Sequence, residues 1–333
     1  MERNLRFDFY KGFLMFGVIW GHLITCLLGG ERNDISIHWM LRTYDMPFFM
    51  FISGYFLAIG LQRKNIKQML LDKVTTILLP TVFWSLLCSM FRAWDMFYFL
   101  WAVFYSSVFV TCANMASNKV LRYSLLFAFG IGLSCFDAPF YNMSYLYPFF
   151  VLGYVYKEEQ LGNCVRNLLG RGGWFTIIFV IYIVCLCFWE TKYSIWHTNG
   201  NILSADLYKT LIIVFRLLIG CLGIIVVKHL ADILYAYMEE SNNWFYRLMI
   251  KSGKETMMIY IFQNAVIFSF GKKIVAKFEE RMGCNPFSAN HPLLGYVLTP
   301  IITVFILYGL LTFITFVKKN KYTAKTFGFK CKL

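Results

Sequence analysis

The chain has 333 residues, of which 59% are hydrophobic, 20% aromatic and only 15% charged. Soluble domains carry about 25% charged and about 45–50% apolar residues, so this composition argues against a water-soluble globule and for an integral membrane protein. The formal net charge is +14. Its basic residues lie in short clusters between apolar runs, which is typical of cytoplasmic membrane loops and excludes a nucleic-acid-binding surface as the main interpretation.

Ten apolar segments follow one another along the chain. A membrane-spanning helix needs about 20 mainly apolar residues, because hydrocarbon offers no partner for open backbone groups. The ten segments cover residues 9–29, 38–60, 74–91, 95–113, 120–136, 143–157, 174–190, 209–228, 256–271 and 293–317. We predict an all-α integral membrane protein, a bundle of about ten transmembrane helices. We expect one transmembrane domain over residues 1–333, ending in a basic cytoplasmic tail at 318–333.

The distribution of basic residues predicts the orientation of this bundle. With ten helices, the two termini and every second loop lie on one side, and that side holds 22 of the 32 Lys and Arg residues. The positive-inside rule then places both termini in the cytoplasm of a cell membrane protein. The first apolar run has no small-residue cleavage site, so we interpret it as a spanning helix and not as a removable signal peptide.

The ten cysteines lack the spacing of metal or redox motifs. We interpret the cysteines inside apolar runs (Cys88, Cys112, Cys185, Cys187 and Cys221) as small buried hydrophobic residues. Cys284 is a lone cysteine in a predicted external loop, and we predict neither a metal site nor a disulfide framework. The chain also lacks the HExxH, GxSxG, P-loop and GxGxxG patterns, so nothing indicates a permanently bound cofactor or nucleotide.

The first apolar segment carries a histidine deep in the membrane. Lys11 and His22 are separated by roughly 16 Å along a helix, which puts His22 past the middle of a hydrocarbon core about 30 Å thick. Ionisable groups at that depth are costly and usually face the bundle interior. A neutral imidazole there can act as a base. The alternative is that His22 only forms a hydrogen bond to a neighbouring helix.

The second segment combines charged, kinking and small residues. Arg42 and Asp45 are three residues apart on one helix face, so they can pair with each other or line a polar pocket. Pro47 should kink the helix. Ser53 and Gly54 allow a close helix approach.

Two further clusters have open interpretations. The basic residues of the loop at 63–73 serve either as the positive-inside signal alone or as contacts for a phosphorylated cytoplasmic ligand. Near the end of the chain, Thr256, Tyr260 and Gln263 share one face of a helix. These polar side chains either hold helices together or line a substrate path.

Several of these strings together resemble the membrane acyltransferase-three family, which includes O-acetyltransferases of bacterial surface polysaccharides. The resemblance spans residues 8–264. Its specific part is Asp8, Lys11, Gly12 and His22, followed by the string from Met46 to Tyr55 that reads MPFFMFISGY. Weaker matches are Leu78-Leu79-Pro80, the string FFVLGY at 149–154, and Ser252 to Ile261.

The resemblance implies transfer of an acyl group, usually acetyl, from cytoplasmic acyl-CoA to a hydroxyl of an exported or cell-surface carbohydrate. His22 would be the base or the acyl carrier. The residues implied for the donor are Asp8, Lys11, Arg63, Lys64 and Lys73. Those implied for the acceptor path are Arg42, Asp45, Ser53, Tyr55, Tyr260 and Gln263. Because no extracytoplasmic domain follows the last helix, we expect the transfer to be completed within the bundle.

The chain departs from the family pattern at three positions. Many relatives have arginine in place of Lys11, and histidine in place of Asp45 and Gln263. These changes leave His22 as the single strong catalytic candidate. Two alternatives are a non-enzymatic transporter or flippase of a glycan or lipid intermediate, and an inactive partner in a cell-envelope complex.

Overall fold

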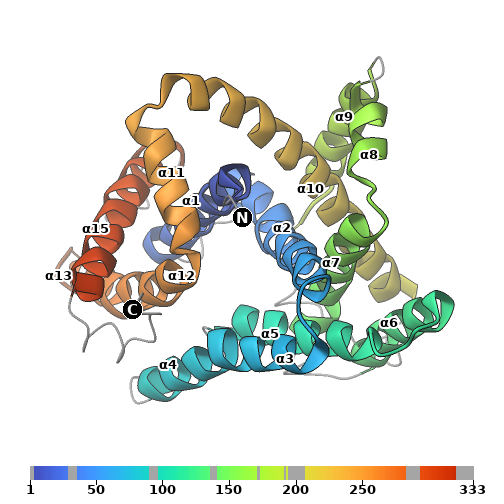
Figure 1. Ribbon diagram of the computed structural model, residues 1–333. Helices are drawn as coiled ribbons and strands as arrows, with labels where there is room; N and C mark the ends of the chain where they lie inside the picture. Colours follow the sequence, from blue (N-terminus) through green and yellow to red (C-terminus); the bar gives the residue numbers. More distant parts are fainter. Residues whose placement is uncertain are drawn as a thin grey trace. The chain divides into compact units, whose positions relative to one another are not determined.

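A computed structural model describes residues 4–28, 36–89, 97–135, 141–170, 173–190, 193, 207–282 and 293–319. The secondary structure in these ranges is helical, and the described residues contain no strand (Figure 1). The chain divides into two compact units. Unit 1 comprises Met1–Asp45 and Lys228–Leu333, and unit 2 comprises Met46–Val227. Most of the predicted basic tail, from residue 320 on, lies outside the described residues.

Unit 1 is organised around its first helix, α1. Helices α11, α12 and α15 pack against α1, as Figure 1 shows. The helices of this unit are α1 (Leu5–Leu28), the start of α2 (Ser36–Leu61), the end of α10 (Leu207–Ser241), α11 (Trp244–Lys254), α12 (Thr256–Asn264), the π-helical η5 (Ala265–Gly271), α13 (Lys272–Met282), π-helical η7 (Leu294–Leu298) and α15 (Thr299–Lys319).

Two glycines bring the backbones of α1 and α11 into direct contact. A Cβ built on Gly12 would lie 2.0 Å from the carbonyl oxygen of Met249, and one on Gly253 would lie 1.7 Å from that of Asp8. The two contacts are reciprocal, since the helices run antiparallel. Without a hydrophobic driving force between helices in lipid, close backbone approach at small residues is what holds such a pair together. Gly12 and Gly253 therefore have a packing role.

Unit 2 holds the rest of α2, with Pro47 inside it, and continues through shorter helices. These are α3 (Ile66–Lys73), the π-helical η2 (Val74–Leu78), α4 (Leu79–Ser89), α5 (Tyr98–Ala113), α6 (Lys119–Ser134), α7 (Tyr141–Glu158), α8 (Gly162–Gly170), α9 (Trp174–Cys187) and the start of α10. Gly54 of α2 and Gly153 of α7 repeat the reciprocal contact, because a Cβ on either would lie 1.9 Å from a carbonyl oxygen of the other helix.

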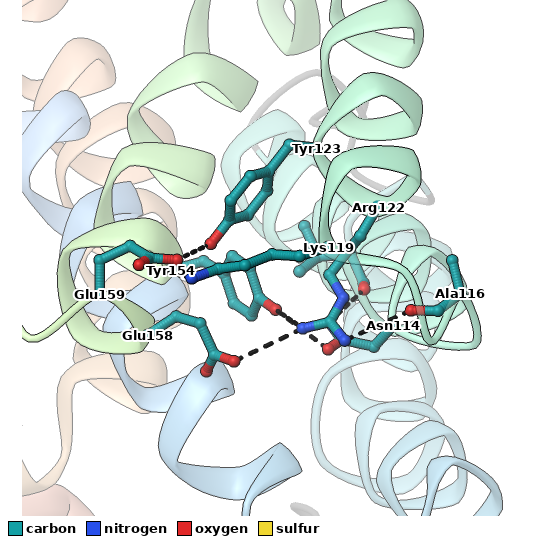
Figure 2. Close-up of polar contacts among 9 residues, drawn as sticks. Asn114, Ala116, Lys119, Arg122, Tyr123, Tyr154, Glu158 and Glu159 are labelled. Carbon is teal, nitrogen blue, oxygen red and sulfur yellow. Dashed lines mark hydrogen bonds and ion pairs between the residues drawn. The ribbon is translucent and has the colours of Figure 1, made fainter.

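A polar cluster joins the start of α6 to the end of α7 (Figure 2). Arg122 pairs with Glu158 at 3.4 Å and donates to the carbonyl of Ala116 at 3.3 Å. Lys119 pairs with Glu159 at 2.7 Å, and Tyr123 also donates to Glu159. These two hydrogen bonds lower the pKa of Glu159, so its carboxylate stays ionised at neutral pH. The cluster fixes this end of the α6–α7 pair.

The helices are those of a multi-pass membrane protein. In the described ranges, five helices are long and apolar enough to cross a membrane, or six if the bent pair α8–α9 forms one span. Large apolar side chains such as Ile177, Leu211, Phe305 and Phe316 are exposed on α9, α10 and α15. Such surfaces are unfavourable in water and favourable against lipid.

Each of the ten predicted spans coincides with a helix, but some are short. Helices α5 and α6 have 16 residues each and α9 has 14, whereas a full span needs about 20. The count of ten spans and the cytoplasmic termini therefore stay predictions.

Residues 272–281 were expected in a loop and form most of α13 instead. Their apolar positions, such as Val275, recur at helical intervals between charged residues, and such an amphipathic helix lies below the hydropathy of a span.

Candidate functional site

His22 lies on α1 in the interior of unit 1, with 9% of its surface exposed. Its Nδ1 atom lies 2.9 Å from Oε1 of Gln263 on α12. The Gln263 side chain is completely buried, and its Nε2 donates to Oδ1 of Asn264 at 2.8 Å. Because an amide oxygen only accepts, the imidazole donates from Nδ1 to Gln263. In the neutral ring this leaves the lone pair on Nε2.

A change of helical geometry follows directly after Gln263 and Asn264. The chain becomes π-helical over η5, where Phe268 packs edge-on against the His22 ring with 5.0 Å between centroids. The carbonyl of Ile267 accepts from the thiol of Cys26 at 3.5 Å. π-Helical turns occur frequently at functional sites. Here the π-helical turn carries Phe268, which packs against the His22 ring.

Arg42 of α2 lies beside the turn of α1 that carries His22. A Cβ built on Gly21 would lie 3.9 Å from the guanidinium carbon of Arg42. Arg42 and Asp45 form the ion pair predicted from their spacing, at 3.9 Å, with only 2% of the Asp45 side chain exposed. The result is a cation next to a buried imidazole, within a protein interior where charge interacts strongly.

A second histidine lies on the same side of α1. His38 begins the predicted span at 38–60, and it is buried in the first turn of α2. Its Nε2 lies 3.0 Å from Oγ1 of Thr25, which itself donates to the carbonyl of Gly21 at 2.9 Å. Sequence reasoning missed this arrangement, because the contact depends on the antiparallel packing of α1 and α2 and not on any local pattern.

The opposite end of α1 carries a charged cluster. Lys11 pairs with the buried Asp8 at 2.9 Å. Asp232 of α10 accepts from Tyr10 and pairs with Lys228 at 2.9 Å and Arg6 at 3.7 Å. Arg6 and Lys228, which both pair with Asp232, were not among the residues singled out for the donor. Their only sequence signal is their place in the basic cytoplasmic segments.

The remaining predicted site residues belong to two places. Tyr260 is buried in α12 of unit 1. The others lie in unit 2, where Ser53 donates to the carbonyl of Phe49 at 2.9 Å and the Lys157 ammonium lies 5.9 Å from the centre of the Tyr55 ring. Arg63 is exposed, Lys64 pairs with Asp72, and Lys73 ends α3. Unit 1 therefore brings together Asp8 with Lys11, His22 with Gln263, and Arg42 with Asp45.

Comparison with known proteins identifies a matching family and two similar proteins. A family described as an acyltransferase domain matches residues 4–318. Two curated relatives are both described as nodulation protein NolL. The one from Mesorhizobium japonicum is 24% identical over 80% of this chain and 77% of its own length. The one from Sinorhizobium fredii is 24% identical over 80% of this chain and 78% of its own length. No solved structure matches the chain.

Proposed function

Because the chain belongs to the acyltransferase-three family of membrane acyltransferases, we propose that it transfers an acetyl group from cytoplasmic acetyl-CoA to a hydroxyl of an exported or cell-surface carbohydrate. The observation that carries the proposal is the buried His22 ring held by Gln263. Family membership favours an enzyme over the transporter alternative, and the orientation of this ring supports His22 as the base of that enzyme.

The arrangement around His22 supports general base catalysis. Gln263 holds Nδ1, so Nε2 can accept a proton from the acceptor hydroxyl as its oxygen attacks the thioester carbonyl carbon. The C–S bond then breaks, and the imidazolium returns the proton to the leaving thiolate, which departs as free CoA thiol. A histidine oriented by a neutral amide partner performs the same role in papain-like proteases.

Arg42 is suited to the charge that develops in this reaction. Negative charge moves onto the thioester oxygen in the transition state, and a fixed cation nearby stabilises it more than it stabilises the neutral thioester. Arg42 lies beside Gly21, one residue before His22. The alternative role of His22 as a covalent acyl carrier uses the same Nε2 atom and the same cation.

The two ends of α1 suit the two substrates. Lys11 lies eleven residues before His22 on α1, and it offers a cation to the phosphates of the donor. Arg6 at the start of α1 and Lys228 of α10, which both pair with Asp232, are proposed as further cations for these phosphates. In unit 2, Arg63, Lys64 and Lys73 are proposed as additional donor contacts. Arg42, Asp45, Ser53, Tyr55, Tyr260 and Gln263 are proposed for the acceptor path. With ten spans and both termini in the cytoplasm, the Lys11 end faces the donor and the His22 end faces outward.

The test is transfer by the purified chain in detergent micelles. With radiolabelled acetyl-CoA and a soluble oligosaccharide acceptor, we expect H22A to lower the rate of CoA release by about 100-fold to 10,000-fold, because the base is lost. H229A is the matched control, since His229 on α10 has no role in the proposed reaction. A wild-type rate in H22A would refute the role of His22, whereas absence of release in every variant would contradict acetyl-CoA as the donor.

A further inference from the structure

An apolar pocket lies between α6, α7 and α10, wholly within unit 2. Its volume is about 520 Å³, within the range of about 300–1,000 Å³ that small-molecule sites occupy. Its walls are almost entirely apolar and include Leu126, Phe127, Val151, Leu152 and Leu217. None of the residues assigned to acyl transfer lines it.

The two ends of this pocket differ. Helices α6 and α7 are antiparallel neighbours, so Tyr123 and Val155 lie at one end and Ser134 and Ser144 at the other. Tyr123 belongs to the cluster with Lys119 and Glu159 shown in Figure 2, and that cluster ties the helices together at its end. From Tyr123 to Ser134 the pocket follows α6 for roughly 16 Å.

The serine end of the pocket carries a buried cation. Arg216 of α10 lines the pocket with 3% of its surface exposed, and its guanidinium carbon lies 5.5 Å from the centre of the Tyr145 ring. One turn further along, α10 touches α7 so closely that a Cβ on Gly220 would lie 2.5 Å from Phe149. An ionisable side chain inside a membrane bundle is costly and generally marks a functional site.

We propose that this pocket binds an acidic membrane lipid, with its anionic head group at Arg216 and one acyl chain along α6 and α7. A guanidinium forms charge-assisted hydrogen bonds with a phosphate, and the fork geometry favours two parallel bonds. The apolar walls match an acyl chain. The site lies in different residues from the proposed acyl transfer and does not depend on it.

Native mass spectrometry of the purified full chain tests the proposal, with phosphatidylglycerol and phosphatidylcholine added to neutral detergent. We expect wild type to bind phosphatidylglycerol about tenfold more tightly than phosphatidylcholine. R216Q should lose that preference and R216K should keep it, because the charge at the head group decides it. Retention of the preference in R216Q would overturn the proposal.

A pair of glycines on α6 gives a second test that does not depend on Arg216. Gly130 lines the pocket, whereas a Cβ on Gly132 has no atom within 4 Å. G130L should lower the binding of both lipids by filling the pocket, and G132L should leave binding unchanged. Equal binding by G130L and wild type would contradict the site. Displacement of phosphatidylglycerol from wild type by palmitoyl-CoA would assign the pocket to an acyl donor and likewise contradict it.

Discussion

At the scale of single residues, the central feature is the chain of contacts from His22 to Gln263 and Asn264. A general base needs a defined tautomer, and this is usually fixed by the hydrogen bond that the other ring nitrogen makes. An acidic partner is common in this role. Here a buried amide takes its place, in a membrane interior where an ionised carboxylate is expensive.

This contact predicts the effect of changing Gln263. Q263A should lower kcat by about 100-fold with little change in KM, because the ring loses its orientation and not its substrate. Q263E should recover much of the rate, since a carboxylate oxygen can accept from Nδ1. Q68A, at an exposed position on α3, serves as the control. A loss in Q263A that Q263E does not relieve would indicate a packing role alone.

The sequence identified His22 and Gln263 as separate candidates but not as partners. His22 was notable for its depth in the membrane. Gln263 was notable for sharing a polar helix face with Thr256 and Tyr260, and for a resemblance in which relatives have histidine at that place. The two residues are 241 positions apart, so only the packing of α12 on α1 brings them together. The same reason explains why the contact between His38 and Thr25 was not predicted, because these two residues lie on different helices.

At the scale of the elements, glycines decide how closely the helices approach. Gly12 and Gly253 join α1 to α11, and Gly54 and Gly153 join α2 to α7. All four lie in the strings that carry the family resemblance. The sequence indicated close approach only at Ser53 and Gly54, since a lone glycine does not reveal which helix it will face.

Two alanine substitutions in unit 1 should change stability in opposite directions. G12A should lower the free energy of unfolding by about 1–3 kcal/mol, because its Cβ would overlap the Met249 carbonyl oxygen. G309A, where a Cβ meets nothing within 4 Å, should raise it by about 0.5–1 kcal/mol through helix propensity. Thermal unfolding in detergent measures both. Equal shifts in the two variants would contradict the close packing of α1 on α11.

At the scale of the whole molecule, composition and hydropathy predicted an all-helical membrane protein, and the structure confirms this class. The hydropathy pattern also located the helices, since each predicted span coincides with a helix of the structure. It could not predict α13 or the π-helical segments η2, η5 and η7, because amphipathic and irregular turns leave little trace in average hydropathy. Nor did it indicate the apolar pocket at Arg216, which forms only when α6, α7 and α10 meet.

The most direct measurement is mass analysis of the surface carbohydrate from living cells. Cells lacking this gene should lose one acyl increment from the carbohydrate. Wild type and H229A should restore it, and H22A, expressed at the same level in the membrane, should not. An acyl increment that persists without the gene, or that H22A restores in full, would contradict acyl transfer through His22.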